Sequence, residues 1–139
     1  PDLSAALCAA SLRGVDVRVL VPGRNNQPIV AWASRALAPE LLERGVRIAE
    51  QPPPFAHTKG AIFDDAYGLV GSHNIDPRSL RLNFELGLEV FDAELVGRLA
   101  GVFVERWERS REWTLPELAG LSLGVRIRDN LARLASPYL

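Results

Sequence analysis

Methionine is absent from this sequence of 139 residues, and cysteine occurs once. Because a complete reading frame starts with methionine, its absence predicts that these residues are a piece of a longer polypeptide. The single cysteine, Cys8, excludes an intramolecular disulfide, and its alanine-rich surroundings favour a buried, unreactive thiol. No run of about 18 or more apolar residues is present, so a membrane-spanning helix within these residues is excluded.

An excess of positive charge is lacking as well. The chain carries 16 Lys and Arg against 17 Asp and Glu, which gives a formal net charge of -1. Nucleic-acid-binding proteins usually carry a basic excess, so nucleic acid is not expected as a partner, and a nuclease is disfavoured without being excluded. The composition, 47% apolar and 24% charged, is that of an ordinary globular protein. We expect one domain over 1–139, in which 114–139 form a C-terminal helical tail.

Hydrophobic periodicity and turn residues predict alternating helices and strands. Helices are expected over 2–12, 28–44 and 92–111, and strands over 15–21, 46–50 and 84–91. Pro39 is expected to kink or break the second helix, because proline lacks an amide hydrogen and its ring clashes with the preceding turn. The order of these elements indicates an α/β fold with a mixed, largely parallel sheet flanked by helices.

The stretch from His57 to Glu85 carries the candidate chemistry. His57 and Lys59 are two residues apart, so on a strand their side chains point to the same side, and Ser72 and Asn74 repeat this spacing. The turn formers between the two pairs predict a hairpin. If the hairpin is symmetric about its turn, His57 lies opposite Asn74 and Lys59 opposite Ser72, so that all four share one face.

These four side chains suit chemistry at phosphorus. An imidazole can attack or transfer a proton, and an ammonium, a hydroxyl and an amide can hold phosphate oxygens. An H-x-K pair by itself is more typical of an ordinary exposed strand, and the wider spacing carries the functional interpretation. No His, Cys and carboxylate set has the spacing of metal ligands, so neither a metal nor another cofactor is expected.

The wider spacing is H-x-K-x4-D-x6-G-S-x-N, with Asp64 at the aspartate position and Gly71 before Ser72. It resembles the HKD signature of the phospholipase D superfamily. The residues around Asn74 and Glu85 and the closing stretch 131–139 are similar to the C-terminal half of bacterial cardiolipin synthases of this superfamily. The resemblance implies a phospholipase D-like domain that is one of two repeats in a longer chain.

This resemblance implies a phosphatidyltransferase that exchanges a phospholipid phosphodiester through a phosphohistidine intermediate. His57 would act as the general acid and base, with the role of nucleophile as the alternative, while Lys59 and Asn74 would bind the phosphate oxygens and Ser72 would assist. Glu85 would fix the tautomer of the catalytic imidazole.

Asp64 completes the HKD motif and is counted among the catalytic candidates, with a structural role in the turn as the alternative. The implied substrate is a phospholipid similar to phosphatidylglycerol. Transfer between two such lipids would release glycerol.

One copy of the motif cannot supply the two histidines that the implied mechanism uses. The partner is therefore expected to be the N-terminal HKD repeat of the same chain or a second copy in a dimer. Two alternatives stay open, a phospholipase D or nuclease-type phosphodiesterase that uses water as the acceptor, and an inactive isolated half-domain.

The end of the chain has an amphipathic pattern. Ile127, Leu131 and Leu134 form an apolar stripe beside arginines such as Arg126 and Arg133. This pattern predicts either a helix that docks on the domain or a segment that contacts an anionic membrane surface. We expect a membrane-associated bacterial protein whose catalytic domain faces the cytoplasm.

Overall fold

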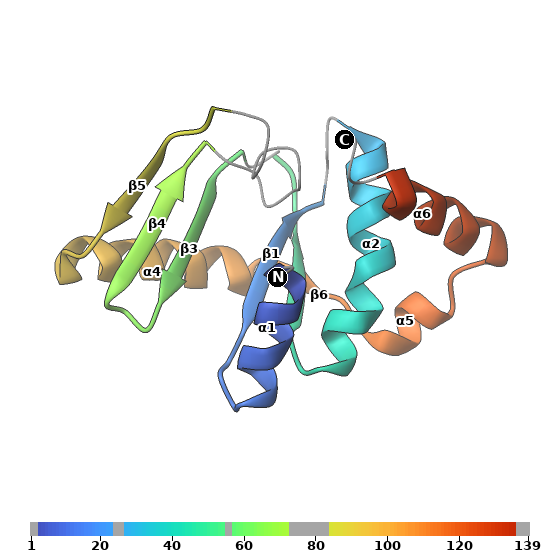
Figure 1. Ribbon diagram of the computed structural model, residues 1–139, viewed down its shortest axis with the longest axis horizontal. Coiled ribbons are helices and arrows are strands. Elements are labelled where there is room, and N and C mark those ends of the chain that lie inside the picture. Colours follow the sequence, from blue (N-terminus) through green and yellow to red (C-terminus); the bar gives the residue numbers. More distant parts are fainter. Residues whose placement is uncertain (1–2, 24–26, 55–56, 73–83, 136–139) are drawn as a thin grey trace.

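The computed structural model describes residues 3–23, 27–54, 57–72 and 84–135. Helices and strands alternate in the order α1 (Leu3–Leu12), β1 (Arg18–Pro22), α2 (Pro28–Glu43), β2 (Arg47–Gln51), β3 (Lys59–Phe63), β4 (Tyr67–Gly71), β5 (Gly87–Val90), α4 (Ala93–Glu108), β6 (Arg111–Glu112), α5 (Leu115–Ala119) and α6 (Leu123–Ala135). The strands form two sheets, β1-β2-β6 and β3-β4-β5, which lie side by side (Figure 1).

The first sheet carries the packed core. β1 and β2 pair in parallel from Arg18 opposite Arg47 onwards, and the short β6 adds to β2 in antiparallel orientation. A cluster of buried side chains joins this sheet to its helices: Cys8, Ala38, Leu41, Val46, Ile48 and Leu118. Cys8 is thus the buried thiol that the sequence predicted.

The second sheet is an antiparallel meander built on the predicted hairpin. β3 pairs with β4 so that Lys59 lies opposite Gly71 and Phe63 opposite Tyr67. The symmetric register predicted from the sequence is therefore wrong by one residue, because Lys59 does not face Ser72. The turn occupies 64–66, and both Asp64 and Asp65 adopt a positive φ, of 51° and 54°. Aspartate tolerates this left-handed conformation better than most residues.

Helix α4 lies beneath both sheets and connects them (Figure 1). Asp92 caps it by accepting a hydrogen bond from Leu95 N at 2.8 Å. Val96, near the N-terminal end, is fully buried, and a Cβ built at Gly68 of β4 would lie 3.7 Å from its side chain. At the other end the buried Trp107 receives cation-π contacts from the first sheet, including Arg47 of β2 at 5.2 Å.

The tail packs on the domain through α6. Arg35 of α2 donates from Nε to Asp129 at 2.6 Å, and Asp129 is buried. Burial raises the pKa of Asp129, but hydrogen bonds from Arg35 and Arg128 outweigh burial and hold the pKa below its usual range. Arg128 also lies over the ring of Trp32, 4.4 Å from its centroid. One side of α6 is therefore a docking surface, as the sequence allowed.

The expected mixed α/β class is confirmed, but less of it is parallel than expected. Within the described part of the chain, parallel pairing is found between β1 and β2 alone. α2 runs through Pro39 as one helix rather than breaking there. The strand β6, a two-residue element after α4, was not predicted.

Candidate active site

His57 and Lys59 meet at the open end of the hairpin. A proline connector leads from the end of β2 at Gln51 to His57, and Lys59 is the first residue of β3. Lys59 Nζ lies 2.8 Å from Nδ1 and 2.9 Å from Nε2 of His57, and it donates to the main-chain oxygen of His57 at 3.0 Å. The ammonium and the imidazole can therefore act on one substrate group.

Ser72 and Glu85 form a second pair at the same end of this sheet. Ser72 Oγ donates to Glu85 Oε2 at 2.5 Å and accepts from Leu86 N at 3.0 Å. Ser72 N in turn donates to Leu86 O at 2.9 Å, which continues the β4–β5 ladder beyond its last residues. The Ser72 hydroxyl thus holds the Glu85 carboxylate, whereas the sequence had placed it on the face of Lys59.

The strand register brings the two pairs to one edge. Lys59, Gly71 and Gly87 are neighbours across β3, β4 and β5, and Ser72 and Glu85 lie just beyond this row. Neighbouring strands are about 4.8 Å apart, so the row spans roughly 10 Å.

Asp64 is not brought to this edge. It lies in the turn at the far end of the hairpin, and a strand rises about 3.3 Å per residue, which places it roughly 16 Å from Lys59. Its positive φ and turn position fit the structural role that the sequence left open as the alternative, and a role in catalysis stays a prediction. Asn74 lies outside the described residues.

Arg106 is a residue of this region that the sequence did not single out for the site. Its Nη1 donates to Oγ1 of Thr58 at 3.3 Å, and Thr58 separates His57 from Lys59. This contact connects α4 to the start of β3. Sequence spacing could not reveal it, because the two residues are far apart in the chain.

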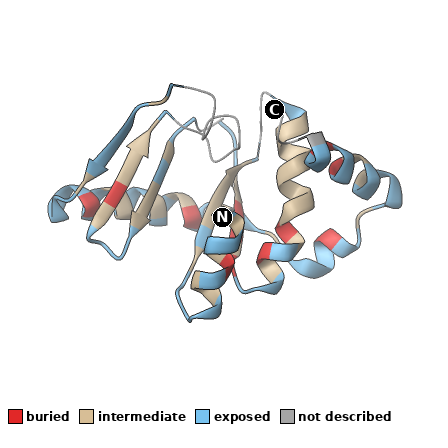
Figure 2. Ribbon diagram, in the orientation of Figure 1, coloured by how far each residue is buried: buried red, intermediate tan, exposed pale blue. Residues whose placement is uncertain are grey.

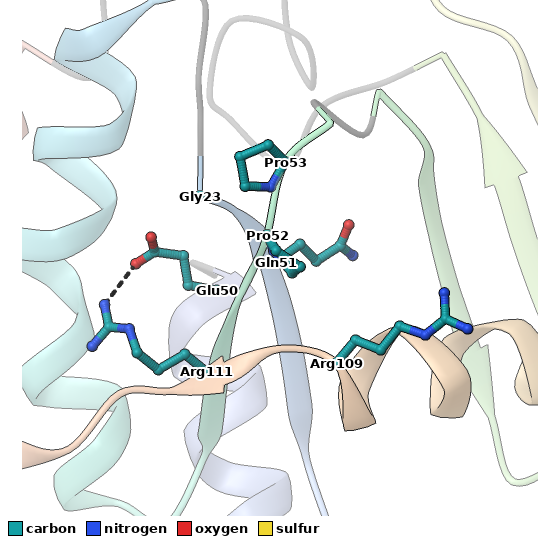
Figure 3. A pocket seen from close by; sticks show the side chains of 7 residues that line it. All are labelled: Gly23, Glu50, Gln51, Pro52, Pro53, Arg109 and Arg111. Atoms are coloured by element: carbon teal, nitrogen blue, oxygen red, sulfur yellow. Dashed lines mark hydrogen bonds and ion pairs between the residues drawn. The ribbon is translucent and has the colours of Figure 1, made fainter.

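A shallow hollow of about 230 Å³ lies at the carboxyl ends of β1 and β2, where the connector to His57 begins (Figure 3). It is lined by Gly23, Glu50, Gln51, Pro52, Pro53, Arg109 and Arg111. Glu50 accepts from Arg111 at 3.1 Å and from Trp113 Nε1 at 2.8 Å. Gly23 N donates to Gln51 O at 2.9 Å, and a side chain at Gly23 would collide with that carbonyl. These contacts fix the strand end from which the connector starts.

Neither a metal cluster nor a membrane span is found within the part of the chain that the structure describes. Among the residues described, no group of three or more His, Cys, Asp and Glu side chains is arranged to hold a metal ion. No described helix combines the length and apolar character needed to cross a membrane.

Comparison with known proteins gives the family. The profile of the family described as "Cardiolipin synthase, PLD-like domain" matches residues 1–107. Cardiolipin synthase A of Citrobacter koseri is 41% identical over 138 residues, which are 99% of this chain and 28% of that protein. The major cardiolipin synthase ClsA of Bacillus subtilis is 36% identical over 141 residues, covering 100% of this chain and 29% of that protein.

A solved structure shares the fold. It is the crystal structure of a phospholipase D family member, Nuc from Salmonella typhimurium, with a TM-score of 0.66 and 24% sequence identity. The match covers 81% of this chain and 74% of that chain. The chain spans less than a third of the length of the cardiolipin synthases that it matches.

Proposed function

Because the chain belongs to the cardiolipin synthase PLD-like domain family, we propose that it is one catalytic half of a phosphatidyltransferase of the phospholipase D superfamily. The observation that carries the proposal is the meeting of the Lys59 ammonium with the His57 imidazole, 2.8 Å from Nδ1, at the open end of the hairpin. A cation beside an imidazole is suited to a phosphodiester, whose transition state needs both charge stabilisation and proton transfer.

The reaction proceeds in two displacements. The imidazole of the other repeat attacks phosphorus of a phosphatidylglycerol-like lipid, and His57 gives its proton to the departing glycerol oxygen. The hydroxyl of a second lipid then attacks the phosphohistidine while His57 takes the proton from that hydroxyl. Lys59 neutralises the charge on the non-bridging oxygens in both transition states, and Asn74 supplies a further donor.

Ser72 has a different task from the one implied by the resemblance. Its hydroxyl donates to Glu85, 2.5 Å away, and accepts from Leu86 N, so it positions Glu85 rather than the phosphate. A carboxylate held in this way can orient the catalytic imidazole and stabilise its charged form. Glu85 is then the residue that orients His57.

The active unit contains a second HKD repeat, from the same polypeptide or from a second copy. This part of the proposal rests on chain length, because the chain spans 28% of the Citrobacter koseri relative, and on the single histidine in the motif. The protein acts at the bacterial membrane, where its lipid substrates reside, with the catalytic domain on the cytoplasmic side and the tail against the lipid surface.

The test is a transfer assay with the longer polypeptide that contains this chain and vesicles of labelled phosphatidylglycerol. We expect cardiolipin and glycerol as products, and no product from His57→Ala. Arg98→Ala changes an exposed residue of α4 and serves as the control, with unchanged turnover. Unchanged turnover in His57→Ala would refute the assignment, whereas release of phosphatidic acid without transfer would identify a hydrolase.

The isolated chain provides a second test. As a monomer it should turn over little or no phosphodiester, because the second histidine is missing. Appreciable activity of the purified monomer would contradict the two-repeat proposal.

A further inference from the structure

An apolar stripe on α6 faces outward. Leu123, Ile127, Leu131 and Leu134 recur at helical spacing, and between 52% and 76% of each residue is exposed. At 1.5 Å per residue the stripe extends over roughly 17 Å. A shallow groove of about 310 Å³ runs along it. Single exposed apolar residues are ordinary, but a continuous row of four marks an interaction surface.

The opposite side of α6 already binds the domain. Asp129 and Ala132 are buried on that side, and Arg128 lies against Trp32 of α2. Arg133 adds an ion pair with Glu40 of α2 at 3.1 Å. The helix is therefore held in a fixed orientation, with the stripe on its exposed side, and Figure 2 shows much of α6 coloured as exposed. A rigidly presented apolar face differs from a loose tail that could fold back on its own protein.

The charge around the stripe favours an anionic partner. α6 contains three arginines and one acidic residue, Asp129, whose carboxylate is buried and paired with arginine. Arg126 flanks the stripe and lines its groove. The exposed side of α6 is thus apolar with the cationic Arg126 at its border, while Arg128 and Arg133 pair with Asp129 and Glu40. A cation beside an apolar stripe suits a helix that lies in the interface of an anionic bilayer.

The tail is also aligned with the cardiolipin synthases, although it lies outside the family profile. The family profile ends at residue 107, before α5 and α6 begin. The alignments with the two cardiolipin synthases nevertheless cover 99% and 100% of this chain, so they include α6. A segment that the profile does not include, but that aligns with these cardiolipin synthases, is suited to contact with the lipid.

We propose that the stripe Leu123, Ile127, Leu131 and Leu134 of α6 inserts into the surface of an anionic lipid bilayer, with Arg126 at the headgroups. This deepens the proposed function, on which it rests for the lipid as partner. The insertion would hold the hairpin edge with His57 and Lys59 near the bilayer from which the substrate comes. The partner is the bilayer surface itself, not a single bound lipid.

Vesicle sedimentation of the chain tests the proposal. We expect binding to phosphatidylglycerol vesicles, with at least tenfold weaker binding for Leu131→Asp. Leu12→Asp introduces the same charge at a comparably exposed leucine of α1, 69% exposed, and should bind as the wild type does. Arg126→Gln should weaken binding to phosphatidylglycerol vesicles more than to phosphatidylcholine vesicles. Failure of the wild type to bind, or equal losses in the two aspartate variants, would overturn the proposal.

Cysteine labelling separates the bilayer from a protein partner. Cys8 is buried, so Leu131→Cys in the longer polypeptide places one accessible thiol on the stripe within the described residues. We expect a maleimide to label it in buffer and phosphatidylglycerol vesicles to block labelling, while Leu12→Cys labels in both conditions. Protection without vesicles would show that protein covers the stripe and would overturn the proposal.

These measurements are independent of catalysis. His57→Ala should bind vesicles as the wild type does even though it transfers nothing. A variant that loses transfer but still binds vesicles therefore tests the proposed function. A variant that loses vesicle binding but still transfers to detergent-dispersed lipid tests the role of α6.

Discussion

The two sheets of this molecule differ in how they are packed. The β1-β2-β6 sheet is joined to α1, α2 and α5 through a continuous buried cluster that includes Val46 and Ile48. The β3-β4-β5 sheet has α4 on one face (Figure 1), and several of its large apolar side chains, such as Phe63 and Leu88, are exposed. Of the candidate catalytic residues, Lys59 is the first residue of β3 in the second sheet, and His57, Ser72 and Glu85 lie just outside the ends of its strands.

The two sheets therefore have different roles, the first in stability and the second in contact with the substrate. The first sheet buries apolar surface and supplies the free energy that keeps the chain folded. The second sheet keeps one face open, so that charged and polar side chains at its edge can reach a substrate. Binding and catalytic segments are commonly drawn from the less stable parts of a fold.

The largest effect is expected on transfer activity, from a substitution in the second sheet. Lys59→Ala should lower transfer about 10³-fold, because it removes a cation that stabilises the transition state, while the free energy of unfolding stays within about 0.5 kcal/mol of the wild type. A stable Lys59→Ala variant with normal turnover would contradict the assigned role.

The second largest effect is expected on the free energy of unfolding, from a substitution in the first sheet. Ile48→Ala should lower the free energy of unfolding by about 2 to 4 kcal/mol, because it leaves a cavity in the buried cluster. Leu88→Ala on β5, where the side chain is 62% exposed, should change it by less than about 0.5 kcal/mol. Urea unfolding of both variants measures the contrast, and equal losses would show that the two sheets are packed alike.

Asp129 should make the packed half sensitive to acid. Its folded-state pKa is lowered, so its contribution is present above about pH 4 and is lost as the pH falls through the folded-state value. Asp129→Asn should cost about 1 to 3 kcal/mol at pH 7 and progressively less at lower pH. Asp16→Asn disrupts an exposed ion pair with Arg18 and should cost less. Urea unfolding between pH 7 and pH 3 tests this, and a pH-independent cost would refute it.

The smallest effect is expected from Ser72→Ala. Loss of the hydroxyl frees Glu85 without removing it, so we expect turnover to fall about tenfold with the KM for the lipid unchanged. The pH profile of kcat should shift as well if Glu85 orients the imidazole as proposed. Ser72→Thr keeps the hydroxyl and should restore most of the activity. A rise in KM alone would indicate that Ser72 binds the phosphate instead.

Local signals predicted much of the fold. The hairpin turn and the parallel pairing in the sheet were both predicted from local sequence patterns, and the structure confirms a hairpin between β3 and β4 and a parallel pair of β1 and β2. The hairpin register was not predictable in this way. Whether Lys59 faces Gly71 or Ser72 depends on which residues close the turn, and two consecutive aspartates with positive φ shift the pairing by one.

Contacts between segments that are distant in the chain could not be predicted from the sequence either. Arg106 lies 48 residues from Thr58, and β6 pairs with β2 across a comparable distance in the chain. Such contacts form when α4 packs beneath both sheets, and the hydrophobic periodicity of the sequence does not predict them. The same packing decides which side of α6 is buried and which apolar stripe remains exposed.

The sequence by itself determined the motif, its chemistry and the elements that carry it, because spacing along a strand or helix sets which side chains can share a face. Only the tertiary structure decided that Ser72 holds Glu85, that Asp64 lies at the far end of the hairpin, and that α6 presents leucines to solvent. These features depend on register and packing, which a single residue in a turn can change.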